Sequence, residues 1–172
     1  MKPRPSFAEI LAFNVAIVGQ GRALAQHYVG RVEAYAAHVG PHLRHVIEHY
    51  EALLARAPDE LVDYDHRPRD RRVERMPDLA VRRFDGITGT LAALEGREPG
   101  EPVSVGFTIG VDGADFCVSG STLARELLFV ASHAVHHYAI LRPLAEAAGI
   151  ALPAPFGKAP ETVRHERLQW AP

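Results

Sequence analysis

Two stretches of this chain have the apolar spacing of amphipathic helices and also concentrate histidine. Residues 42–49, His-Leu-Arg-His-Val-Ile-Glu-His, and residues 133–137, His-Ala-Val-His-His, hold six of the ten histidines of the 172-residue chain. Residues four apart on a helix lie on one face, so His133 and His137 place their rings side by side. Because unpartnered polar groups are costly in a core, the two predicted helices are expected to lie where their imidazoles can share a partner.

The second stretch places its histidines on the apolar face of its helix. Val130, His133, His137, Leu141 and Leu144 follow helical steps of three and four residues. The two histidines therefore take positions that core residues usually fill. Three imidazoles around one point are typical of a metal site with one position open for water or substrate. A ligand from the first stretch would complete such a site.

In the first stretch the spacing does not select one ligand. His45 shares a helix face with His49 at i,i+4 and with His42 at i,i+3, so all three are candidates. His136 lies about 100° around the helix from His137. We therefore expect His136 to form a hydrogen bond or touch a substrate rather than bind the ion.

Glu126 lies seven residues before His133 and therefore on nearly the same helix face. A carboxylate there could orient a histidine or act as a general base. The alternative is a first-turn acid that interacts favourably with the helix dipole. Tyr64, Asp65 and His66 are secondary candidates for orientation or proton transfer.

Two further features of the sequence bear on the substrate. Arg67, Arg69, Arg71 and Arg72 could line a pocket for an acidic thiol or substrate, but a solvated loop is the more common role of such a run. Cys117 lies in a predicted strand and is expected to be a small buried hydrophobe. Any reacting thiol would then come from a cofactor.

The order of predicted elements gives a fold class. Four helices most simply form a bundle, whose interior commonly holds metal sites built from facing side chains. We therefore expect an all-α fold, a four-helix bundle with a short β-hairpin inserted before the last long helix, in one domain over residues 1–172. The polar stretch 61–72 is interpreted as a connection. The predicted helices cover residues 7–29, 40–56, 77–95 and 121–148, the hairpin covers 103–118, and an extended tail at 150–172 wraps the domain.

Composition argues against several classes of partner. A net charge of −2 does not fit a general nucleic-acid binder, because such proteins concentrate positive charge. Cys117 is the only cysteine, so no intramolecular disulfide can form, and a reducing, cytoplasmic compartment is expected. Glu9 and Asn14 interrupt the apolar start that resembles a secretion signal. No apolar stretch reaches the roughly 20 residues that span a bilayer, so no membrane partner is expected.

The histidine stretches resemble the DinB/YfiT-like family of metal-dependent proteins. This resemblance implies a four-helix bundle whose divalent ion is held by one histidine of the second helix and an H-x-x-x-H pair of the fourth. The pair corresponds to His133 and His137, and the single ligand best matches His45. The common family ending His-Arg-Gly-Gln is replaced here by His137-Tyr138-Ala139-Ile140, so any role of that Arg and Gln is absent. The resemblance covers nearly the whole domain and rests on residues 40–50, 63–67, 125–127, 132–138 and 155–160.

The resemblance also implies a reaction class, since related families include thiol-dependent transferases and proposed hydrolases. We expect a metal-dependent enzyme that activates a small thiol or water, with Glu126 and His136 as candidate catalytic residues. Zinc or nickel is the first expectation, although iron, cobalt, manganese and copper also accept imidazole. A small-molecule substrate is expected, and the resemblance is compatible with a homodimer. The alternative is a non-enzymatic, stress-associated binding or structural protein in which the metal only stabilises the fold.

Overall fold

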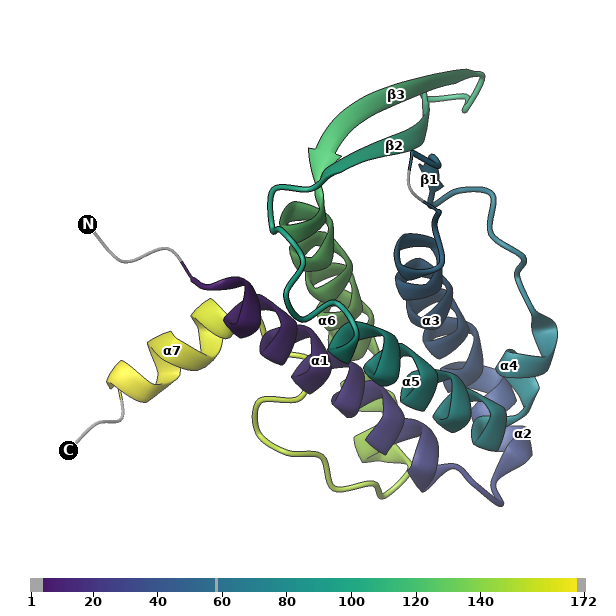
Figure 1. The fold of residues 1–172 in the computed structure, drawn as a ribbon. Coiled ribbons are helices and arrows are strands. Elements are labelled where there is room, and N and C mark those ends of the chain that lie inside the picture. The colour runs from purple at the N-terminus through teal and green to yellow at the C-terminus, as the bar shows by residue number, and fades with distance from the viewer. Residues whose placement is uncertain (1–4, 58, 170–172) are drawn as a thin grey trace.

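The computed structural model describes residues 5–57 and 59–169. Four long helices pack together, and a small sheet lies across one end of them (Figure 1). Both α1 and α3 contact α5 and α6. The long helices are α1 (Phe7–His27), α3 (Gly40–Leu54), α5 (Pro77–Ala92) and α6 (Leu123–Ala147), and the shorter ones are α2 (Val32–Ala34), η1 (Tyr35–Val39), α4 (Arg71–Arg75) and α7 (Pro160–Gln169).

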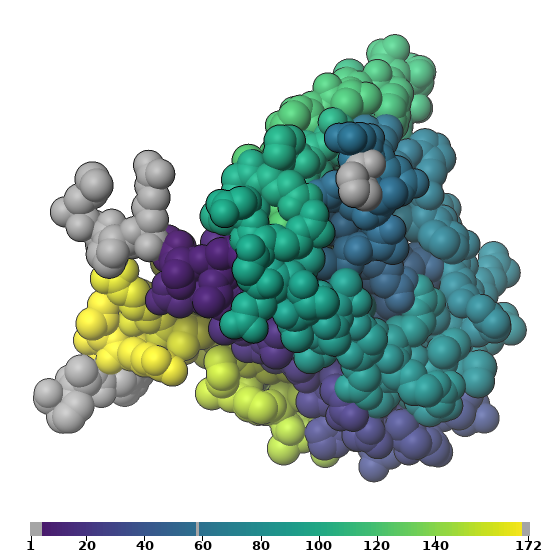
Figure 2. Space-filling model, viewed as in Figure 1, coloured from purple at the N-terminus to yellow at the C-terminus, as the bar shows by residue number. Residues whose placement is uncertain are grey.

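The prediction of an all-α four-helix bundle is wrong, because a three-stranded mixed sheet is part of the fold. Strands β2 (Pro102–Ile109) and β3 (Asp115–Thr122) form the hairpin that the sequence predicts, and this hairpin projects beyond the helices (Figure 2). Strand β1 (Val62–Asp63) adds to β2 in parallel, with its valine opposite Val105. It falls in the stretch interpreted as a connection, because two residues give no alternating pattern.

The four predicted long helices are present, and their starts are marked by local signals. Ser6 and Glu9 form a reciprocal capping box at the start of α1. The Thr122 side chain accepts a hydrogen bond from the backbone N–H of Arg125 at the start of α6. Proline occupies the first turn of α3 and of α5, where its missing N–H has no cost.

The tail predicted as extended over residues 150–172 is partly helical, because α7 begins at Pro160. Its last three residues lie outside the described part of the chain. The segment before α7 contacts α6, where the Arg142 guanidinium donates to the backbone oxygens of Phe156 and Pro153. A Cβ on Gly157 would lie 2.6 Å from the carbonyl carbon of Tyr138. This close approach packs the segment around Gly157 against α6.

Within the described residues, α1 is the one helix long and apolar enough to cross a membrane by length and composition, a test that core helices also pass. Val18 and Leu24 are fully buried. Asn14, also fully buried, accepts a hydrogen bond of 3.0 Å from the Tyr50 hydroxyl of α3. A Cβ on Gly21 would lie 2.3 Å from the Tyr138 hydroxyl, so this glycine permits α1 to pack closely on α6.

Candidate metal centre

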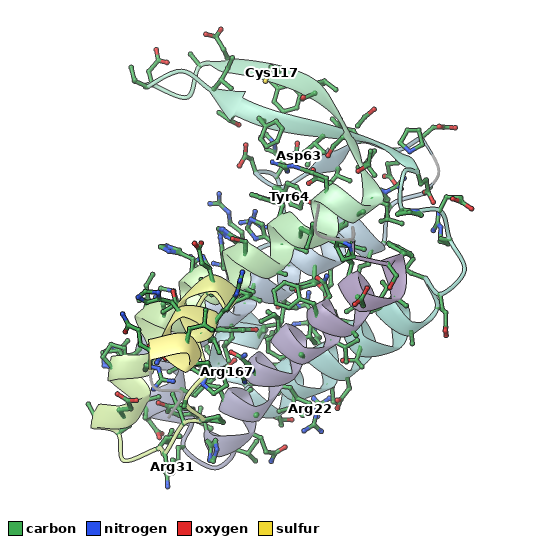
Figure 3. The ribbon with its side chains drawn as sticks, turned by 90° about the vertical axis from the view of Figure 1, so that its left-hand side faces the viewer. Arg22, Arg31, Asp63, Tyr64, Cys117 and Arg167 are labelled. Atoms are coloured by element: carbon green, nitrogen blue, oxygen red, sulfur yellow. The ribbon has the colours of Figure 1, made fainter. Side chains whose placement is uncertain are left out.

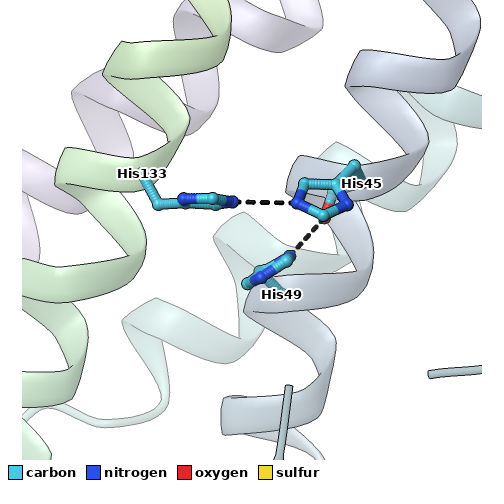
Figure 4. A group of neighbouring side chains, drawn as sticks. All are labelled: His45, His49 and His133. Atoms are coloured by element: carbon cyan, nitrogen blue, oxygen red, sulfur yellow. Dashed lines mark hydrogen bonds between the residues drawn. The ribbon is translucent and has the colours of Figure 1, made fainter. Parts of the chain in front are cut away.

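Helices α3 and α6 bring three histidine rings together, two from α3 and one from α6 (Figure 4). His45 Nε2 lies 2.9 Å from His133 Nε2. His49 Nδ1 lies 2.8 Å from the backbone oxygen of His45. One ring nitrogen from each residue lies within 4.8 Å of the others, so these three side chains could hold a metal ion.

His137 adjoins this triad but forms a separate pair. Its ring centroid lies 4.6 Å from that of His45 and 4.7 Å from that of His133. Its Nδ1 atom lies 2.8 Å from Nδ1 of His42. The sequence predicts His45, His133 and His137 as ligands. In the structure the nitrogens that converge belong to His45, His133 and His49, so His49 is a second candidate for the third ligand. His137 stays a predicted ligand, because its ring contacts those of both His45 and His133.

Burial sets the charge of these rings. Burial is the largest cause that lowers the pKa of His45, His49 and His137 to about 3, and for His45 and His49 the charge of the nearby Arg67 contributes to this value. Burial also lowers the pKa of His133. The rings are therefore neutral at pH 7, and neutral imidazole is the form that coordinates metals.

Arg67 contacts two members of the triad. Its side chain is 7% exposed, with Nη1 3.2 Å from His49 Nε2 and Nη2 3.1 Å from His45 Nδ1. A guanidinium has donors and no acceptor, so both contacted ring nitrogens carry lone pairs. His49 Nδ1–H then donates to the His45 carbonyl, and His45 Nε2–H donates to His133 Nε2. The sequence includes Arg67 among four loop arginines and does not predict this contact.

Glu126, which the sequence predicts to orient a histidine or act as a general base, lies buried at the start of α6. Its carboxylate is 1% exposed and accepts hydrogen bonds from Tyr64 (2.9 Å), Ser121 (2.6 Å) and Arg125 (2.8 Å). None of its hydrogen bonds within residues 5–57 and 59–169 goes to a histidine. It approaches the triad only through Tyr64, whose ring stacks on that of His49 with centroids 5.4 Å apart. Burial and the Glu126 charge both raise the pKa of Tyr64.

The remaining sequence candidates lie outside the triad. His136 is exposed, with its ring centroid 5.5 Å from that of His137. His66 pairs with Asp63 within the loop. The Asp65 carboxylate accepts a hydrogen bond from the Thr108 backbone N–H and so ties the loop to β2.

Cys117 lies in the hairpin, and Figure 3 shows it beyond Asp63 and Tyr64 at the sheet end of the molecule. It is partly exposed rather than fully buried as the sequence predicts. Its β3 position opposite Phe107 places it in the projecting sheet and not among the histidines of α3 and α6.

Comparison with known proteins assigns no function to this arrangement. No family model matches the sequence, and no solved structure matches it. A stretch of 109 residues, 63% of this chain, is 28% identical to a protein named FK506-binding protein 5 from Rhizopus delemar. The chain spans 28% of that protein's length. The resemblance to the DinB/YfiT-like family therefore rests on the motifs alone.

Proposed function

We propose that this protein belongs with the DinB/YfiT-like proteins and binds a divalent metal ion between α3 and α6. The observation that carries the proposal is the convergence of ring nitrogens from His45, His49 and His133 within 4.8 Å. The donor set fits a divalent ion, because neutral imidazoles from two helices leave a coordination position open. Zinc and nickel are the first candidates, since both accept imidazole.

The protein would act as an enzyme on a small molecule. When bound, the ion would supply Lewis acidity that makes water or a low-molecular-weight thiol nucleophilic near neutral pH. The His42–His137 pair, with its 2.8 Å contact, lies beside the triad. Hydrolysis and thiol transfer both fit this arrangement. A cytoplasmic location, a homodimer and the absence of nucleic-acid and membrane partners are further parts of the proposal.

A second candidate function needs no reaction. Because His45 and His49 come from α3 and His133 comes from α6, an ion on these residues would join two helices. The protein would then be a binding or structural protein in which the ion stabilises the fold. Turnover separates the candidates, since a purely structural ion gives stability without catalysis.

Metal analysis of protein purified without a polyhistidine tag tests the site. After supplementation we expect about one ion per chain in wild type and less than about 0.1 in His133→Ala. His136→Ala is the matched control for metal content, because His136 is an exposed histidine of the same helix. Comparing His49→Ala with His137→Ala decides which of them is the third ligand. Wild-type protein with less than about 0.1 ion per chain would reject the site.

A turnover screen then tests the enzyme. Wild type and His133→Ala are assayed with common small thiols paired with electrophiles, and with small hydrolysable substrates. We expect metal-dependent turnover in wild type alone. Equal rates in both proteins, together with metal-dependent stability in wild type, would favour the structural function.

A further inference from the structure

The Arg67 guanidinium donates hydrogen bonds to ring nitrogens of His45 and His49. A metal ion bound to the histidine triad would compete for the lone pairs on these rings. His49 Nδ1–H donates to the His45 carbonyl, which leaves Nε2 as the only nitrogen of His49 able to bind an ion. That nitrogen accepts from Arg67 at 3.2 Å. The buried guanidinium and an ion therefore require the same lone pair.

The contact between Arg67 and His45 also conflicts with metal binding, whichever ring nitrogen of His45 binds the ion. If His45 bound an ion through Nδ1, it would lose the 3.1 Å hydrogen bond from Arg67 directly. If it bound through Nε2, its ring proton would move to Nδ1 and face the Arg67 N–H, donor against donor. Either choice excludes Arg67 from its present position. The positive charges of ion and guanidinium add to the exclusion.

Arg67 has a place to which it can withdraw. It lines an open cavity of about 380 Å³ whose carboxylates are Glu48, Glu51, Glu60 and Asp63. Glu48 is 1% exposed, and its Oε2 lies 3.9 Å from Arg67 Nε, which has no hydrogen-bond partner among the described residues. Arg56 and His66 also line the cavity, and Glu48 already accepts from Arg44 at 3.0 Å, but the four carboxylates outnumber these cations and favour a guanidinium on this side.

We infer that Arg67 is an internal competitor of the metal ion, which holds His45 and His49 in the metal-free protein and withdraws toward Glu48 when the ion binds. This inference rests on the proposed metal site. Arg67 would then set the metal affinity without being a ligand. Removing the guanidinium is therefore expected to tighten metal binding.

Titration with Zn²⁺ against a chromophoric chelator tests this. We expect the dissociation constant of Arg67→Met to be at least tenfold lower than that of wild type. Arg67→Lys, which keeps the charge but cannot donate to both rings in the same way, should lie between them. Arg69→Met is the matched control, since it removes an exposed arginine of the same loop and should change the constant less than twofold. His133→Ala should not bind.

A second measurement needs no metal. Nitrogen-15 spectra of the histidine rings should show His45 protonated at Nε2 in metal-free wild type, and should lose that preference in Arg67→Met. Equal zinc affinities of wild type, Arg67→Met and Arg67→Lys, with His133→Ala unable to bind, would overturn the competition and leave the metal site standing. Failure of every variant and of wild type to bind would overturn both.

Discussion

Replacing Glu126 tests whether this buried acid supports the fold or the chemistry. In Glu126→Ala the Tyr64 hydroxyl, in a residue only 4% exposed, loses its acceptor, and an unsatisfied buried group costs about 1–3 kcal/mol. The lost side-chain atoms add about 1 kcal/mol for the cavity they leave. We expect the free energy of unfolding to fall by about 2–4 kcal/mol, each kcal/mol lowering Tm by roughly 2–4 °C.

Two milder variants separate charge from hydrogen bonding. In Glu126→Gln the amide oxygen can still accept from Ser121 and Arg125, while the amide N–H can donate to the Tyr64 oxygen, so the expected loss is below about 1.5 kcal/mol. Tyr64→Phe removes the same contact from the other side and is expected to cost about 1.5–3 kcal/mol, since its acceptor is charged. The double variant Tyr64→Phe with Glu126→Ala should cost less than the sum of the two.

Urea unfolding and metal content, measured on the same preparations, decide the matter. The structural role requires that Glu126→Gln stay folded and keep its metal content and turnover. A stability of Glu126→Ala within about 0.5 kcal/mol of wild type would refute the reasoning. A stable Glu126→Gln protein that loses metal or turnover would show instead that the carboxylate acts at the site.

Three further predictions concern packing, metal linkage and pH. Gly157→Ala should cost about 2–4 kcal/mol, because φ is +63° and the new Cβ would lie 2.6 Å from the Tyr138 backbone. Gly19→Ala, where a Cβ meets nothing within 4 Å, should stabilise by up to about 1 kcal/mol, and equal losses would contradict this account. Zinc at about 1,000 times its dissociation constant should raise the unfolding free energy of wild type by about 4 kcal/mol and leave His133→Ala unchanged, which thermal unfolding checks. In metal-free protein the lowered pKa of His49, about 3, contributes stability that is present above the unfolded value near 6.5 and is lost as pH falls toward 3. Urea unfolding across that range should show a shallower decline in His49→Gln, and identical slopes would refute the assignment.

Local signals in the sequence account for the long helices. The apolar periodicity and the caps at Ser6 and Thr122 involve residues a few positions apart, so a sequence analysis can recognise them. Strand β1 has only two residues and gains its hydrogen bonds from β2, about forty residues along the chain. Helix α7 buries none of its residues and therefore has no apolar face to reveal it. The sequence does not predict β1 or α7, because neither element has a periodic pattern of buried apolar residues.

The candidate site, too, could be predicted from the sequence only in part. Spacing alone identifies the histidines of α3 and α6 as neighbours, but His45 with His49 and His133 with His137 are equivalent i,i+4 pairs. The choice among them depends on ring orientation, which Arg67 helps to set. The sequence favours a solvated loop for this arginine, and that interpretation holds only for its neighbours, Arg69, Arg71 and Arg72, which are exposed.

Strand β1, which the sequence analysis missed, adds to the predicted hairpin and helps to position Arg67 beside the histidines. Pairing of β1 with β2 fixes Val62 and Asp63, the Tyr64 hydroxyl bonds to Glu126, and the Asp65 carboxylate accepts from the Thr108 N–H at 2.7 Å. Four consecutive residues are thus anchored immediately before the loop enters the site. Because the anchors come from β2 and from the start of α6, displacement of the hairpin would move the guanidinium relative to the triad. If the histidine triad binds an ion as proposed, its occupancy would be coupled to the packing of the sheet through this loop, which touches both.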